Sequence, residues 1–303
     1  MPSGQMPTWQ RHTSAIVSGF VGDWLESRQN PLAVAMQVLE GGRPLDVGAP
    51  QPTMACGTLC LSIHGLMELE TVWKIPGTSG DTYGSSLSRR IPGGVSSLTL
   101  RYNTGRPIYS NGEELADLLE QLVAGWPVPV TRLILIGHSM GGLLVRSACH
   151  VAQARGQAWV DALTDCVYVG SPHDGSWLAR GAHAVAELMS DMPRDYLRVI
   201  GEVVDLRSEG IRNLSRGDVV AEGEESPPLL PGVKHFVVCG LLARARQNPV
   251  NALFGDALVH ESSARGEQRS GWHLAGMATF PGVDHVTLAR HPDVAKQLEE
   301  WLV

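Results

Sequence analysis

The segment Gly-His-Ser-Met-Gly-Gly at residues 137–142 constrains the fold more than any other part of this 303-residue chain. It follows the apolar run 132–136 directly and opens directly into the very apolar stretch 140–154. A strand that turns this sharply into a helix strains the residue at the turn, and the flanking glycines leave room because they lack a Cβ. The turn presents the hydroxyl of Ser139 at a helix N-terminus, which favours developing negative charge. The pattern therefore predicts that Ser139 is a nucleophile, rather than an incidental serine in a tight turn.

Further apolar runs alternate with helical patterns along the rest of the chain. We expect strands at residues 58–63, 97–102, 132–136, 166–169, 235–239 and 273–278, and helices at 14–26, 111–126, 140–154 and 293–302. The second of these helices is expected to take Asn111 as its N-cap, with Glu114 completing a capping box. Continuous apolar strands separated by helices indicate a mostly parallel sheet that is covered on both faces. The predicted fold class is therefore α/β, with a doubly wound sheet.

One interval is too long to be a simple connection in such a sheet. The strand ending near residue 169 and the strand starting near residue 235 are separated by far more chain than a connection needs. We therefore predict a helical cap insertion at about 176–231, over the site. Candidates for an acyl pocket, or equally for ordinary core packing, are Trp73, Trp177, Met189 and Met192.

A serine hydroxyl becomes a strong nucleophile only when a base takes its proton and an acid holds that base in place. The base is expected on the loop after the last strand, where His285 lies. The competing histidines are His138 inside the elbow and His260, His273 and His291 nearby. In chain order the acid comes between the serine and the histidine. Asp256 follows the strand at 235–239 and is the predicted acid, with Asp174 as the alternative.

The negative charge that develops on the substrate oxygen needs two backbone donors. The residue after the nucleophile, Met140, is expected to supply one amide. The other is expected from the loop after the strand at 58–63, where the amide of Leu66 follows Gly65. An ordinary turn after that strand is the alternative interpretation.

Composition and charge exclude several other classes of protein. The chain has 24 basic and 31 acidic residues, a net charge of −7, and no basic run, so we expect no nucleic-acid partner. No metal-binding pattern and no glycine-rich nucleotide loop occurs, so no metal and no cofactor is expected.

Five cysteines in mostly apolar surroundings suggest buried, reduced thiols, with a Cys56–Cys60 disulfide as the alternative. We see no signal-peptide pattern and no apolar run long enough for a transmembrane segment. Together these features predict a cytoplasmic protein.

The domain prediction divides the chain at residue 53. Residues 1–52 are expected to form an N-terminal helical segment and a Gly/Pro-rich linker, and residues 53–303 the main domain with its cap. The amphipathic pattern at 14–26 is typical of a helix packed on the core. The alternative is an interfacial helix, which would allow a homodimer.

These motifs resemble, in their order, those of bacterial lipase-like and esterase-like α/β-hydrolases, in particular relatives of the GPI inositol-deacylase group. The matching segments are 61–66, 102–105, 136–142, 170–175, 255–259 and 283–285, within about 55–303. The resemblance implies the α/β-hydrolase fold, an oxyanion donor at Leu66 and the acid at Asp256, although Ala257 replaces the usual glycine. It implies hydrolysis of an apolar acyl ester, which is a small-molecule or lipid-like substrate, through an acyl-enzyme. Acyl transfer, amide or thioester hydrolysis, and a non-catalytic binding scaffold remain as alternatives.

Overall fold

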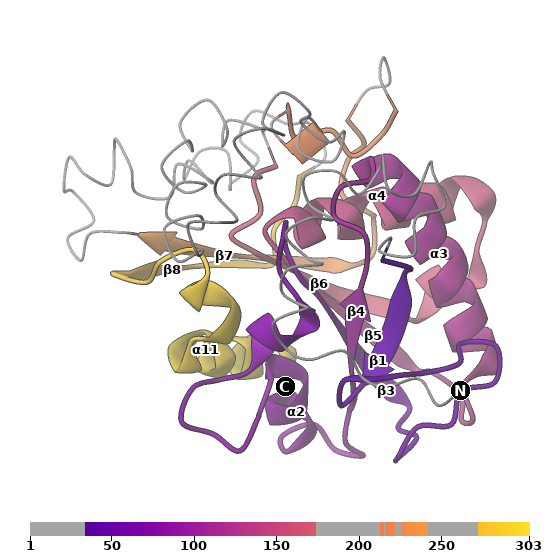
Figure 1. Ribbon diagram of the computed structural model, residues 1–303, viewed down its shortest axis with the longest axis horizontal. Helices are drawn as coiled ribbons and strands as arrows, with labels where there is room; N and C mark the ends of the chain where they lie inside the picture. Colours follow the sequence, from indigo (N-terminus) through magenta and orange to yellow (C-terminus); the bar gives the residue numbers. More distant parts are fainter. Residues whose placement is uncertain (1–33, 174–212, 215, 222–225, 242–271) are drawn as a thin grey trace, which may run out of the picture.

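The computed structural model describes residues 34–173, 213–214, 216–221, 226–241 and 272–303. Within these residues eight strands form one sheet in the order β2-β1-β4-β3-β5-β6-β7-β8 (Figure 1). Their bounds are β1 (Gln37–Glu40), β2 (Arg43–Pro44), β3 (Thr58–Ile63), β4 (Ser96–Arg101), β5 (Arg132–His138), β6 (Leu163–Val169), β7 (Lys234–Leu241) and β8 (Gly276–Pro281). All neighbours from β4 to β8 pair in parallel, whereas β1 pairs antiparallel with both β4 and β2.

Helices cover both faces of the sheet, as the alternating pattern predicts. One face carries α3 (Ile108–Gly125) and α4 (Met140–Arg155), and the other carries α2 (Tyr83–Ser88) and α11 (Pro292–Leu302) (Figure 1). Three short 3-10 helices, η1 (Glu70–Trp73), η2 (Ala158–Ala162) and η3 (Thr287–Arg290), lie in the connections. The predicted doubly wound α/β class is confirmed. Among the described residues, no helix combines the length and the apolarity that crossing a membrane requires.

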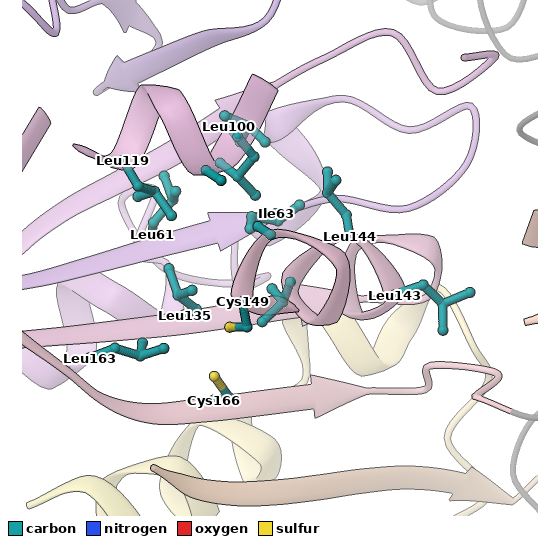
Figure 2. Close-up of a cluster of buried hydrophobic side chains, with 14 of the residues drawn as sticks. Leu61, Ile63, Leu100, Leu119, Leu135, Leu143, Leu144, Cys149, Leu163 and Cys166 are labelled. Carbon is teal, nitrogen blue, oxygen red and sulfur yellow. The ribbon is translucent and has the colours of Figure 1, made fainter. Parts of the chain in front are cut away.

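Two hydrophobic clusters lie on opposite faces because successive strand residues point to opposite sides. Leu133 and Leu135 of β5 join the cluster under α3 and α4, whereas Ile134 and Ile136 join the cluster beside α2 and α11. Figure 2 shows the first cluster, in which side chains from the helices and strands pack between the two layers. β5 is therefore buried on both faces, which fixes the strand that leads to the predicted nucleophile.

All five cysteines are buried and free. Cys149 of α4 and Cys166 of β6 point toward one another within the first cluster (Figure 2). Burial raises the pKa of the Cys60 thiol to about 12, which holds it in its protonated form. Here the cysteines act as small apolar side chains of the core.

The prediction that Asn111 is the N-cap of this helix is wrong. α3 begins earlier, at Ile108, directly after Pro107, whose φ of −50° suits the start of a helix. Asn111 lies inside the helix, where its side-chain amide donates a 2.8 Å hydrogen bond to the carbonyl of Asn103. The side chain therefore ties the helix to the preceding loop and does not cap its first turn.

Residues before the predicted boundary at residue 53 belong to the sheet. β1 and β2 form a hairpin around Gly41 and Gly42, whose φ angles are +56° and +81°. Positive φ at both turn residues is the geometry that two-residue hairpins favour, and glycine adopts it without strain. The segment predicted as a linker thus supplies an edge strand. The predicted helix at 14–26 lies outside the described residues, as does most of the predicted cap.

Candidate active site

Ser139 lies at the turn between β5 and α4, with φ 52° and ψ −122°. In the described part of the chain, Ser139 and Met67 are the two non-glycine residues with positive φ. Such conformations cost roughly 1–3 kcal/mol each and persist where the surrounding structure enforces them. Here the amide of Ser139 donates a 2.9 Å hydrogen bond to the carbonyl of Val169 at the end of β6. Residues 137–142, called the elbow below, are thus held by the neighbouring strand.

The glycines of the elbow are required by close backbone contacts. A Cβ on Gly141 would lie 2.3 Å from the carbonyl oxygen of Ile63, at the end of β3. A Cβ on Gly137 would lie 2.5 Å from the amide nitrogen of Gly142. Because backbone atoms cannot move aside cheaply, these glycines let α4 start directly against the ends of the central strands.

The loop after β3 crosses directly over the nucleophile. A Cβ on Gly65 would lie 2.8 Å from the Cβ of Ser139, so the backbone of this loop packs directly against the Ser139 side chain. Within the described part of the chain, the amides of Leu66 and Met140 have no acceptor. The first amides of a helix have no partner inside the helix, which accounts for Met140. This is what an oxyanion site needs, and the assignment of the two donors stays a prediction.

His285 lies on the loop between β8 and η3, beside the elbow. Its ring centroid is 4.7 Å from that of His138, the residue before the nucleophile. A Cβ on Gly170, after β6, would lie 3.0 Å from His285 Nδ1. Burial, reinforced by the neighbouring His138, lowers the pKa of His285 to about 3. The ring is therefore neutral at physiological pH, which is the form that accepts a proton.

Nδ1 of His285 is buried, and no residue in the described ranges offers it a hydrogen bond. In a catalytic triad this nitrogen donates to the acid, which fixes the tautomer of the base. Asp256 and the alternative Asp174 both lie outside the described residues, so the identity of the acid stays a prediction.

A polar network beside the elbow was not found from the sequence. His138 Nδ1 lies 2.8 Å from Glu68 Oε2, and His138 Nε2 lies 2.9 Å from the carbonyl oxygen of His285. The same Glu68 oxygen accepts the amide of Gly65 at 2.7 Å. Burial alone would raise the pKa of Glu68, but His138 and the Gly65 amide lower it to about 2. The network joins three loops that are distant in sequence.

The sequence profile of the Alpha/beta hydrolase family matches residues 64–297, from the loop after β3 into the last helix. The chain belongs to this family. Comparison with curated protein sequences gives no match.

Solved structures with this fold resemble the hydrolase at low sequence identity. RedJ with a PEG molecule bound in its active site has a TM-score of 0.50 and 16% identity, over 85% of this chain and 100% of that chain. The RedJ thioesterase of the prodiginine pathway from Streptomyces coelicolor has a TM-score of 0.49 and 18% identity, over 86% of this chain and 90% of that chain. A thermophilic esterase from Thermogutta terrifontis has a TM-score of 0.45 and 14% identity, over 89% of this chain and 92% of that chain. At these identities the similarity shows the fold alone.

The predicted pocket residues of the hydrolase fall in two groups. Trp73 is fully buried in the cluster beside α2, where its ring meets that of His138 edge-on at 6.3 Å. The structure therefore places Trp73 in core packing. The remaining candidates Trp177, Met189 and Met192 lie outside the described residues, as does the alternative base His260.

Another alternative base, His291, has a structural role in the hydrolase. His291 precedes α11, and its Nδ1 accepts the amide of Asp293 at 3.2 Å, which caps the helix. Within the described ranges, no group of three or more His, Cys, Asp or Glu side chains is placed to hold a metal ion.

Proposed function

We propose that this α/β-hydrolase is a serine hydrolase that cleaves carboxylic esters through an acyl-enzyme. The observation that carries the proposal is the strained Ser139 at the end of the central strand. The loop that contains Gly65 crosses it, the amide of Leu66 in this loop has no acceptor among the described residues, and the His285 ring lies beside the elbow. A strained serine, an adjacent neutral histidine and the amides of Leu66 and Met140 are the groups that acyl transfer requires.

In the proposed reaction, His285 takes the proton of Ser139 as Oγ attacks the ester carbonyl. The amides of Leu66 and Met140 donate hydrogen bonds to the oxyanion that forms. The tetrahedral intermediate collapses, and His285 passes the proton to the departing alcohol, which leaves Ser139 acylated. Water then attacks the acyl group with the same base, which releases the carboxylic acid and restores the serine. Asp256 is proposed to hold His285 through Nδ1.

The proposed substrate carries an apolar acyl group, and the segment at about 176–231 is proposed to select its length. The same steps would cleave a thioester or an amide, or would transfer the acyl group to another alcohol. The similarity to the GPI inositol-deacylase group stays a prediction.

A fluorophosphonate probe tests the chemistry, because it reacts only with an activated serine. We expect labelling of the wild-type protein and of the control His273→Ala, since His273 is exposed. Ser139→Ala and His285→Ala are expected to lose labelling while keeping the wild-type circular dichroism spectrum. A folded wild-type protein that resists the probe would instead indicate a binding scaffold.

A substrate panel then defines the reaction. p-Nitrophenyl esters from acetate to palmitate, with and without an emulsified interface, separate esterase from lipase behaviour. Matched thioesters and amides identify the preferred leaving group, and added alcohols reveal acyl transfer.

A further inference from the structure

The Glu68–His138 pair lies beside the proposed machinery but has no part in the steps above. We propose that His138 is a positioning residue of this hydrolase, held as an imidazolium between the Glu68 carboxylate and the backbone carbonyl of His285. In this position it fixes the loop that carries the base against the elbow. It also keeps a positive charge beside the His285 ring. The role rests on the proposed function.

The hydrogen bonds determine which nitrogens of His138 carry protons. A backbone carbonyl oxygen can only accept, so Nε2 of His138 must donate to the carbonyl of His285 at 2.9 Å. Nδ1 lies 2.8 Å from Glu68 Oε2, and one proton lies between these two atoms. If the proton belongs to the nitrogen, the ring is charged, and if it belongs to the oxygen, the pair is neutral.

The hydrogen bonds of Glu68 place that proton on His138. Glu68 Oε2 already accepts the amide of Gly65 at 2.7 Å, and a second donor favours the ionised carboxylate. A charged His138 and the Gly65 amide in turn lower the pKa of Glu68 to about 2 despite its burial. The His138 side chain is fully buried and that of Glu68 is about 10% exposed, so the pair is a nearly dry ion pair.

The ion pair connects the parts of the site that must be aligned. Glu68 holds the loop after β3 through Gly65, whose Cβ position lies 2.8 Å from Ser139. His138 belongs to the elbow and holds the loop after β8 through the backbone of His285. A single side-chain pair thus ties the oxyanion loop, the nucleophile and the base to one another.

The charge of His138 acts directly on the base. The ring centroids are 4.7 Å apart, and the positive ring of His138 favours a neutral His285. Glu68 and Asp284 act in the opposite direction, each more weakly than His138. The edge of Trp73 faces His138 from the core and adds no charge. Burial, together with the charge of His138, lowers the pKa of His285, so this ring stays in its proton-accepting form at lower pH than an isolated histidine.

The pH dependence of kcat/KM tests this role with His138→Gln, which retains a donor but removes the charge. We expect kcat to fall about tenfold with little change in KM. The acid limb, which is the pH range where protonation of His285 lowers kcat/KM, should move upward by about half a pH unit or more. Glu68→Gln should shift the limb in the same direction, because a buried His138 without its counter-ion loses its proton. His273→Gln, at an exposed histidine, is the control and should leave the profile unchanged.

A measurement on the unmutated protein covers the case in which these variants do not fold. In ¹⁵N-labelled protein, both ring nitrogens of His138 are expected to be protonated from pH 6 to 8. An unprotonated ring nitrogen would overturn the charged state that the proposal requires. If the fluorophosphonate probe labels the wild-type enzyme, but His138→Gln and Glu68→Gln leave the acidic side of the pH profile unchanged, this role alone is overturned. Failure of the probe to label wild-type Ser139 would overturn the proposed function and this role with it.

Discussion

Two residues with unusual backbone conformations mark the site, and only one of them was identified from the sequence. The glycines and the strand–helix context predict strain at Ser139, whereas no local pattern predicts the positive φ of Met67 in the loop after β3. The Glu68–His138 contact joins residues 70 positions apart. No spacing rule relates such residues, because the contact arises only when the ends of β3 and β5 meet. Local signals therefore found the side chains proposed to react, and the tertiary structure was needed to find the residues that lie against them.

Replacing Ser139 separates strain from function. Ser139→Ala is expected to reduce hydrolysis by on the order of a thousandfold or more, because the triad acts as a unit. Ser139→Gly is equally inactive but relieves the positive φ of 52°. We expect its free energy of unfolding to exceed that of Ser139→Ala by about 1 kcal/mol, measured by urea denaturation. Equal stability of the two variants would show that the backbone at this turn carries no strain.

Nδ1 of His285 is buried and has no hydrogen-bond partner among the described residues, which sharpens the test of the acid. If Asp256 holds this nitrogen, Asp256→Asn should cost several orders of magnitude in kcat, because the base then adopts the wrong tautomer. Asp174→Asn should cost roughly tenfold or less. Steady-state kinetics on the two matched variants distinguish them. The opposite ranking would assign the acid to the loop after β6.

At the scale of elements, the sequence predicted the buried strands well and the edges poorly. The strand at 58–63 has the bounds of β3, because a continuous apolar run buried on both faces leaves a strong local signal. β8 begins at Gly276, three positions after its predicted start, and its side chains are only partly buried. The hairpin of β1 and β2 was missed, although Gly41-Gly42 between two short runs is a hairpin signal. Partly exposed edge strands give weak patterns because few of their side chains are fully buried.

The contact between α3 and α4 gives a prediction that opposes helix propensity. Gly112→Ala at an open helix position would stabilise by about 1 kcal/mol. Here the new Cβ would lie 2.1 Å from Ser147 Oγ and 2.6 Å from its Cβ. We expect a loss of roughly 1–3 kcal/mol in the free energy of unfolding, from overpacking. Adding Ser147→Gly should recover part of the loss in urea denaturation. A stabilised Gly112→Ala variant would contradict this close packing.

At the scale of the whole molecule, one sheet gathers the site from loops that follow β3, β5, β6 and β8. β5 is hydrogen-bonded to β3 on one side and to β6 on the other, so the elbow has a supporting loop on each side. The fold class and the general place of the site follow from this order, which the alternating pattern predicts. The acyl and alcohol specificity does not follow, because it depends on which side chains the folded chain brings together around the substrate.

Acid sensitivity of the folded molecule is expected from two buried groups. The pKa of His285 is lowered from 6.5 to about 3 and that of Glu68 from 4.5 to about 2. Between its folded and unfolded pKa values, each group binds more protons in the unfolded chain than in the folded one. The free energy of unfolding therefore falls as the pH falls through these ranges. Urea midpoints measured from pH 7 to 3 should therefore decrease. In Glu68→Gln the buried His138 is neutral while the unfolded chain protonates it, so this variant should lose stability more steeply than the wild type between pH 6.5 and 4.5. The exposed control Glu113→Gln should follow the wild type. A wild-type midpoint independent of pH would contradict the buried ion pair.

His138 and His285, whose rings are in contact, stand 147 positions apart in the chain. Ribosomal synthesis therefore completes the serine, its helix and the crossing loop well before the base. β8, which leads to that base, pairs in the described sheet only with β7. A nascent chain that has folded as far as β6 presents the serine without a base and is inert toward a serine-directed probe. The onset of probe reactivity during synthesis or refolding therefore reports the docking of the last strand.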